Sequence, residues 1–239
     1  ALPYGDLVIR SNFDAAEELL RTRVSLVRGA DTLLGLAGTY NSRATASPLD
    51  FRLVTHNLPL NLLNPFVKGL LYDVKGEVAI DQLTVRGRLD APEVRGQGHF
   101  KNVSFGVDFF KTEYSFDGII EFAPTRVAFP ALLLRDARGN TARLNGFVYH
   151  KYFKDFNLDI RLSEANQFLV MNTTKDDSEL FFGTAILERG YATVTGPVDR
   201  LNIRANLATG AGTVVSIPIS SYRSGERLNF VYFKGSPTD

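Results

Sequence analysis

The sequence predicts an all-β protein, rich in antiparallel strands, with one short helical segment near residues 58–71. Apolar and polar residues alternate with period two over most of the chain, and helical periodicity is nearly absent. Turn signals such as Gly196-Pro197 recur about every 8–12 residues, the spacing of a β-meander. With 44% hydrophobic and 22% charged residues, the composition is that of a folded globular chain.

Two segments are helix candidates. Within residues 58–71, Leu60 and Leu63 belong to an apolar stripe of helical spacing. Pro65 limits this helix to short turns, because proline removes a backbone donor and clashes with the preceding turn. A second candidate begins at Asp14, an N-cap type of residue, although an alternating strand pattern follows directly.

Four stretches after residue 104 show the strand alternation most clearly: FGVDFF, YSFDGIIEF, FKDFNLDIRLSE and DRLNIRANLAT. In each, apolar side chains fall on one face and polar ones on the other, as in a half-buried antiparallel strand. With two residues of the ARLNGFVYH stretch, the apolar set is Phe105, Val107, Phe109, Tyr114, Phe116, Ile120, Phe122, Leu144, Val148, Phe156, Leu158, Ile160, Leu162, Leu201, Ile203 and Leu207.

The pattern yields roughly eighteen short strands, more than the ~10 that an open twisted sheet usually holds. A barrel, a two-sheet sandwich and a U-shaped strand unit repeated along one axis all solve this problem. TVRGRLDAPEVR (Thr84 to Arg95) and TVTGPVDRLNIR (Thr193 to Arg204) are near-repeats, 193 − 84 = 109 residues apart. This recurrence favours the repeated U-shaped unit.

Residues suited to catalysis or metal binding do not cluster in the sequence. His56, His99 and His150 are dispersed, there is no cysteine, and no nucleophile elbow, P-loop or EF-hand is present. A net charge of +1 argues against nucleic acid as a partner. The densest apolar stretch, VAFPALLL, is too short to span a bilayer. We therefore expect a protein that is not an enzyme and has no cofactor or metal.

Residues 132–174 carry a family pattern: a strand, a D-x-x-G-N turn, an A-x-L-x-G strand, an H-x-x-F-x-D-F strand and N-x-F-x-x-M-N. The following G-T-A strand, the G-P-V-D-x-L-x-I unit and a Gly-Thr strand ending in I-P-I extend it. Earlier, a short helical piece precedes G-x-L-x-x-P-x-x-x-G. From about Leu49 onward, the order of these segments resembles the AsmA-like, TamB-type proteins of Gram-negative envelopes.

The resemblance implies a long β-sheet folded into an open, U-shaped trough, often called a β-taco, in the periplasm. Such proteins are anchored in the inner membrane and are thought to carry phospholipid towards the outer membrane. They are linked to an outer-membrane partner of the Omp85 family, and the family has no catalytic residues. We expect residues 1–239 to be one continuous interior segment of such a protein, with a possible sub-boundary near 100–110 and the anchor outside it.

If the resemblance holds, the apolar set above lines a groove that holds the acyl chains of lipid. Two alternatives remain open. The chain could be an assembly factor whose strand edges pair with strands of outer-membrane β-barrels. It could also be a structural or adhesive solenoid or sandwich, in which the same apolar residues are ordinary core. Which face of each strand is concave is not fixed by the sequence.

Overall fold

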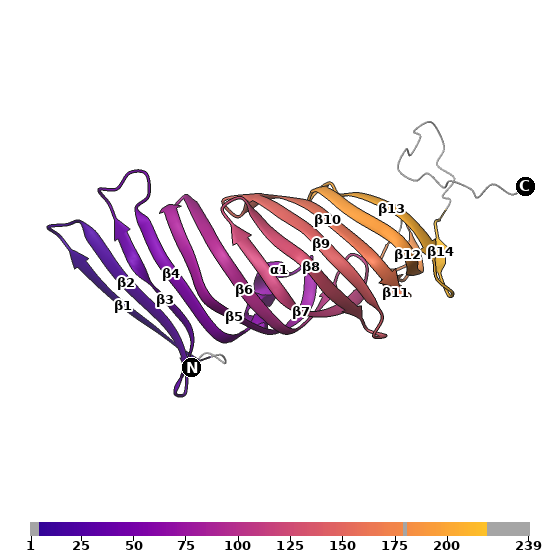
Figure 1. Cartoon of the computed structure of the whole chain (residues 1–239), viewed down its shortest axis with the longest axis horizontal. Coiled ribbons are helices and arrows are strands. Elements are labelled where there is room, and N and C mark those ends of the chain that lie inside the picture. Colours follow the sequence, from indigo (N-terminus) through magenta and orange to yellow (C-terminus); the bar gives the residue numbers. More distant parts are fainter. Residues whose placement is uncertain (1–4, 179–180, 219–239) are drawn as a thin grey trace, which may run out of the picture.

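A computed structural model describes residues 5–178 and 181–218. It is one open antiparallel sheet of 14 strands, curved into a trough, with a single short helical segment (Figure 1). The prediction of an all-β trough is thereby confirmed. The predicted single segment over 1–239 extends beyond the described residues, and its division into domains stays a prediction.

Nearly all strands follow one another across the sheet in chain order, from β1 to β10, and then β12, which pairs with β11, β13 and β14 as well. The strands are β1 (Asp6–Asp14), β2 (Leu19–Arg28), β3 (Asp31–Asn41), β4 (Leu49–Pro59), β5 (Leu71–Arg88), β6 (Ala91–Val107), β7 (Thr112–Ala123), β8 (Arg126–Asp136), β9 (Thr141–Lys151), β10 (Lys154–Asn166), β11 (Phe168–Thr173), β12 (Phe182–Pro197), β13 (Asn202–Thr209) and β14 (Val214–Ser216).

Because the strands are antiparallel, the turns fall alternately on two edges of the trough. The turns β1–β2, β3–β4, β5–β6, β7–β8, β9–β10 and β12–β13 form one edge, called the first rim here, and the turns β2–β3, β4–β5, β6–β7, β8–β9 and β11–β12 form the second rim. The near-repeats are the β5–β6 and β12–β13 hairpins of the first rim. In both, the threonine hydroxyl donates to the arginine carbonyl opposite: Thr84 to Arg95 at 3.3 Å and Thr193 to Arg204 at 3.5 Å.

The described strands are fewer and longer than the roughly eighteen expected. β5, β6 and β12 have 18, 17 and 16 residues, because the chain bends within them instead of turning back. Bulges shift the register in β4, β6, β8 and β10, each beside a non-glycine residue of positive φ. Bulges bend a strand and increase its twist, which explains the curvature of the trough. These residues are Asn57, Asn102, Ala131 and Glu164.

Side chains of neighbouring strands pair with backbone groups that the bulges leave free. Asp117 on β7 accepts the Asn102 N–H at 2.7 Å, and Asn145 on β9 accepts the Ala131 N–H at 2.9 Å. An unpaired backbone N–H is costly, so these contacts stabilise the bends. Polar residues that break the strand alternation are therefore part of the curvature.

The helical segment is confirmed but shorter than predicted: a 3₁₀ turn, η1 (Leu60–Leu63), leads into α1 (Asn64–Val67). Leu60 is buried against β5, and Pro65 stands in the first turn of α1, where its missing N–H costs nothing. Asn64 fixes the segment to a bulge of β5, since its amide accepts the Val74 N–H at 2.9 Å and donates to the Val74 carbonyl at 3.2 Å.

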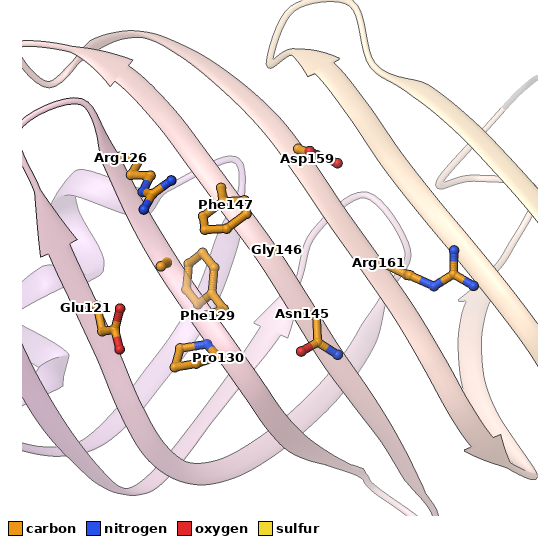
Figure 2. Close-up of a pocket in the computed structure, with 10 residues that line it drawn as sticks. Glu121, Arg126, Phe129, Pro130, Asn145, Gly146, Phe147, Asp159 and Arg161 are labelled. Carbon is orange, nitrogen blue, oxygen red and sulfur yellow. The ribbon is translucent and has the colours of Figure 1, made fainter.

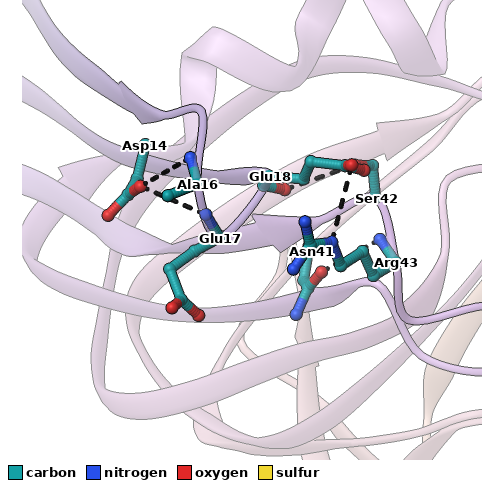
Figure 3. Close-up of polar contacts among 7 residues, drawn as sticks. All are labelled: Asp14, Ala16, Glu17, Glu18, Asn41, Ser42 and Arg43. Atoms are coloured by element: carbon teal, nitrogen blue, oxygen red, sulfur yellow. Dashed lines mark hydrogen bonds and ion pairs between the residues drawn. The ribbon is translucent and has the colours of Figure 1, made fainter.

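The second helix candidate was wrong. After Asp14 the chain makes a turn into β2, as Figure 3 shows. Asp14 Oδ1 accepts the N–H groups of Ala16 at 3.1 Å and Glu17 at 3.2 Å, which closes an Asx-type turn. The side chain that caps a helix can equally close a tight turn, and the alternation of β2 decided the outcome here.

The main hydrophobic core fills the second-rim half of the trough, between β5 and β12. Its buried members are Leu60, Val74, Val78, Ile80, Leu83, Val103, Phe116, Ile120, Leu132, Leu134, Ala142, Ala165, Phe168 and Leu187. β11 and the first part of β12 contribute Phe168 and Leu187, and β11 lies against β7 and β8. The trough is therefore packed near its second rim at this end.

Candidate functional site

A continuous row of apolar residues crosses the inner face of the trough, the face that carries the core. Its members stand directly opposite one another from strand to strand, over eleven strands. Neither a charged nor a polar side chain interrupts the row, because two of the eleven residues are glycines and the others are aliphatic or phenylalanine. The row, called the inner row here, is Ile9, Val24, Leu36, Leu53, Leu83, Gly96, Phe122, Val127, Val148, Leu158 and Gly196.

From β5 onward the inner row runs close to the first rim. Phe122 and Val127 flank the β7–β8 turn, and Gly196 is next to the last residue of β12. Phe122, Val127, Val148 and Leu158 are half-buried, whereas the second-rim half is filled by the core. The strip near the first rim thus keeps partly accessible apolar surface along the sheet.

At the β1 end, large apolar side chains of the inner face are exposed. Leu7, Ile9 and Phe13 have 53%, 60% and 60% of their surface accessible. None belongs to the predicted lining set. The alternation of Leu7, Ile9 and Phe13 in DLVIRSNFD is the signal in the sequence that marks them as one face of a strand.

Eight of the sixteen predicted lining residues belong to or pack against the core. Phe116 and Ile120 are buried members, and Phe105, Tyr114, Phe122, Leu144, Leu162 and Leu207 pack against it. Three predicted residues, Phe122, Val148 and Leu158, lie in the inner row. Ile160 is their neighbour on the inner face, opposite Gly146 and Val194. A lining role for these residues stays a prediction.

The remaining five lie at strand ends or are well exposed. Phe109 is 60% exposed in the β6–β7 turn, where it contacts the Phe110 and Phe181 rings, and Leu201 precedes β13. Their expected strand positions were wrong, because β6 ends at Val107 and β13 begins at Asn202. Phe156 and Ile203 are on strands with 40% and 46% of their surface exposed.

β11 is held to the rest of the sheet by two side chains that bind one backbone residue. The Tyr114 hydroxyl donates to the Leu169 carbonyl at 3.0 Å, and Asp136 Oδ2 accepts the Leu169 N–H at 2.9 Å. Burial raises the pKa of Tyr114 to about 12, so the hydroxyl keeps its proton. The Tyr114 ring stacks on Phe168 at 5.1 Å between centroids. We call this arrangement the β11 clasp.

The outer face of the trough has a different chemistry. Figure 2 shows a depression of about 490 Å³ over β7 to β10, with charged residues around an apolar floor. The Arg126 guanidinium lies there, 4.8 Å from the centre of the Phe147 ring. The lining residues are Glu121, Arg126, Ala128, Phe129, Pro130, Asn145, Gly146, Phe147, Asp159 and Arg161.

In the described residues, 5–178 and 181–218, acidic and histidine side chains do not converge in a group that could hold a metal ion. His150 is buried instead among rings, 4.4 Å from Phe153 and 6.2 Å from Phe156 between centroids. In the same part of the chain, neither η1 nor α1 has the length and hydrophobicity to cross a bilayer.

Comparison with known proteins agrees with the sequence resemblance. Residues 132–239 match a family model, described as TamB: TamB C-terminal domain. Searches of curated proteins and of solved structures found no match. The TamB family comprises envelope-associated transport and assembly proteins. Residues 132–239 are thus similar to the TamB C-terminal domain, and this match, together with the open β-trough, supports the resemblance to TamB-type proteins.

Proposed function

We propose that this chain carries phospholipid along the inner face of its trough, as a periplasmic segment of an inner-membrane-anchored protein that takes part in outer-membrane biogenesis. The observation that carries the proposal is the inner row, an uninterrupted apolar path over eleven strands. An Omp85-family protein of the outer membrane is the partner that we infer from the family.

The free energy of lipid transfer sets the requirement for such a path. Holding the ~30 methylenes of a two-chain lipid in water costs on the order of 24 kcal/mol, at ~0.8 kcal/mol for each. An apolar surface next to the lipid at every step removes most of this cost. Evenly spaced aliphatic residues also avoid a single deep pocket in which a lipid would be trapped.

The same path explains why one half of the inner face is packed and the other half is partly exposed. The second-rim half is packed with core residues and gives the trough its stability. The first-rim half keeps half-buried apolar residues, and Ile9 is largely exposed at the β1 end. Contiguous exposed apolar surface is uncommon in monomers and marks an interaction site. Acyl chains are the ligands whose chemistry matches it.

Photocrosslinking tests the proposal directly. A photoreactive amino acid is placed at Ile9 or Leu158 in the inner row, and at Arg10 or Asp159, the following residues on the opposite face. After incubation with phospholipid vesicles, mass spectrometry should find lipid on the two inner-row positions and little on the two controls. Equal labelling of both faces, or none on either, would contradict the proposal.

Strand pairing is a second candidate, favoured by the open sheet. Within the described residues β1 pairs with β2 alone, and all of its residues except Asp14 are exposed. A partner strand could therefore add to its free edge. Backbone N–H groups of β1 point alternately towards β2 and towards the free edge. One of the two variants Val8→Pro and Ile9→Pro therefore removes an N–H that a partner strand would bind. If the proline variant that removes this free-edge N–H loses function while Ile9→Asp functions normally, strand pairing is favoured over lipid transfer.

A further inference from the structure

The two near-repeats of the sequence place the same three side chains on the outer face. On β4, β5 and β6, Arg52 stands opposite Thr84, which stands opposite Arg95. On β10, β12 and β13, Arg161, Thr193 and Arg204 stand in the same relation, far along the sheet from the first set (Figure 1). We call each set an Arg–Thr–Arg rung. Arg52 and Arg161 lie outside the two repeated motifs. The similarity of the two hairpins therefore extends to the strand that precedes each of them in the sheet.

Each rung has an arginine on either side of a threonine, and in the second rung the Arg161 guanidinium lies over the Tyr191 ring, 3.8 Å from its centre. All four arginines are exposed, and both threonines are half-buried. Both threonine hydroxyls donate to the carbonyl of the next arginine, so they face the backbone. The two arginines of a rung are on strands separated by one further strand. Since adjacent strands lie ~4.8 Å apart, their backbones are about 10 Å from each other.

The first rung belongs to a longer basic row. Arg10 stands directly opposite Arg23, and Ala37 connects Arg23 to Arg52 across β3. Like charges directly opposite on adjacent strands are destabilising. Within residues 5–178 and 181–218, neither Arg10, Arg23 nor Arg52 has a carboxylate within ion-pair distance, whereas Arg95 has Glu93 at 3.5 Å. Such a row is stabilised when an anionic ligand covers it.

The surrounding charges restrict the kind of anion. Asp50 and Glu93 lie in the adjacent row of the first rung, and Asp159 lies two residues before Arg161 in the second. A dense anionic surface, such as a membrane or a nucleic acid backbone, would meet these carboxylates as well as the arginines. Separate carboxylates on an extended polypeptide can reach the arginines alone, and the guanidinium group binds carboxylate bidentately.

We propose that the outer face of the trough binds an extended acidic segment of a partner protein through the two Arg–Thr–Arg rungs. The segment runs across the strands, along the length of the trough, with carboxylates about 10 Å apart. This site is separate from the inner row, so lipid and partner bind opposite faces of the same strands. The proposal does not depend on lipid transfer, because both rungs lie outside the apolar path.

A synthetic peptide with glutamate at every third position and proline between tests the spacing. Its polyproline II helix places a carboxylate about every 9.3 Å on one side. The 239-residue chain should bind it with an affinity that falls as salt rises, and the peptide with glutamine in place of glutamate should not bind. Arg52→Gln with Arg95→Gln, and Arg161→Gln with Arg204→Gln, should each weaken binding roughly tenfold.

Arg86→Gln is the matched control, because Arg86 is an exposed arginine of β5 outside the rungs, with Asp50 at 3.2 Å. Circular dichroism checks that each variant is folded. An equal loss of binding with Arg86→Gln would show that binding depends on the overall positive charge and not on the rungs, which would overturn the proposal. Binding of the glutamine peptide, or binding to vesicles of anionic phospholipid without binding to the acidic peptide, would overturn it too.

Discussion

At the scale of single residues, exposure separates core from candidate groove among side chains that look identical in the sequence. Phe116 is 9% exposed and contacts the Phe100 and Phe105 rings, whereas Ile9 is 60% exposed. Phe116→Asp should destabilise the fold by about 3–5 kcal/mol, because it leaves a cavity and a buried carboxylate. Ile9→Asp should cost less than about 1 kcal/mol. Urea denaturation of both variants measures this, and equal losses would mean that the inner row is core.

His150 gives the stability a pH dependence. Burial lowers its pKa below the ordinary 6.5, and its Nδ1 accepts the Phe153 N–H at 3.2 Å, which leaves no room for a second proton. The unfolded chain therefore takes up a proton first as the pH falls below about 6.5, so the free energy of unfolding decreases there. Above that pH the residue is neutral in both states and the effect vanishes.

Denaturation curves between pH 8 and 5 can isolate this contribution. His150→Gln should be less pH-dependent than the wild type over that range, because it removes a group that prefers to be neutral when folded. An unchanged slope in the variant would show that His150 has no part in the pH dependence. His150→Gln can lower the overall stability without affecting this comparison, since only the slopes are compared.

At the scale of elements, the two homologous hairpins should respond alike to the same change. Gly87 and Gly196 have φ values of 90° and 106°, and a Cβ would lie 2.8 Å from the Ala91 carbonyl oxygen and 2.9 Å from that of Arg200. Gly87→Ala and Gly196→Ala should each destabilise by about 1–3 kcal/mol in thermal or urea denaturation. Gly35→Ala is the control, because a Cβ there meets open space. A neutral effect at either hairpin would contradict their equivalence.

The β11 clasp is the second element open to a direct test. Asp136 is buried and accepts N–H groups of Leu169, Arg138 and Asn140, at 2.8–2.9 Å. Asp136→Ala should cost about 3 kcal/mol, because it leaves the buried Leu169 N–H and two partly buried N–H groups unpaired, and amide exchange in β11 should accelerate most. Asp117→Ala removes one exposed contact and should cost about 1 kcal/mol or less. Uniform acceleration across the sheet would argue against a local clasp.

The sequence predicts those features of an element that depend on residues close together in the chain, and not those that depend on distant residues. Alternation identified strands such as β10, since side-chain period follows from the strand itself. The strand count was too high because glycines such as Gly118 and Gly190 are typical of turns in a local pattern, although they lie within β7 and β12. Core and groove were not separable, because the packing of β11 against β7 and β8 joins residues about 55 positions apart, such as Tyr114 and Leu169.

At the scale of the whole molecule, stability should be distributed unevenly along the trough. Strands of this sheet mostly contact their sequence neighbours, as in repeat proteins, so each region depends on its local packing. None of the buried residues of the main core belongs to β1 to β4, and Leu60 is the first of them in the chain. Leu26, Leu33, Leu49 and Thr55 are the buried side chains before it among the described residues.

Hydrogen exchange under native conditions should therefore show a gradient. Backbone amides of β5 to β9 should exchange slowest, at rates close to those of global unfolding, whereas β1 to β3 should open at a free energy lower by several kcal/mol. Phospholipid bound along the inner row should slow exchange most in β1 to β3, because these strands open most readily and it would cover Ile9, Val24 and Leu36, which the protein leaves partly exposed. Protection that rises equally in β5 to β9 would point to general stabilisation of the fold, and uniform exchange without lipid would contradict the packing gradient itself.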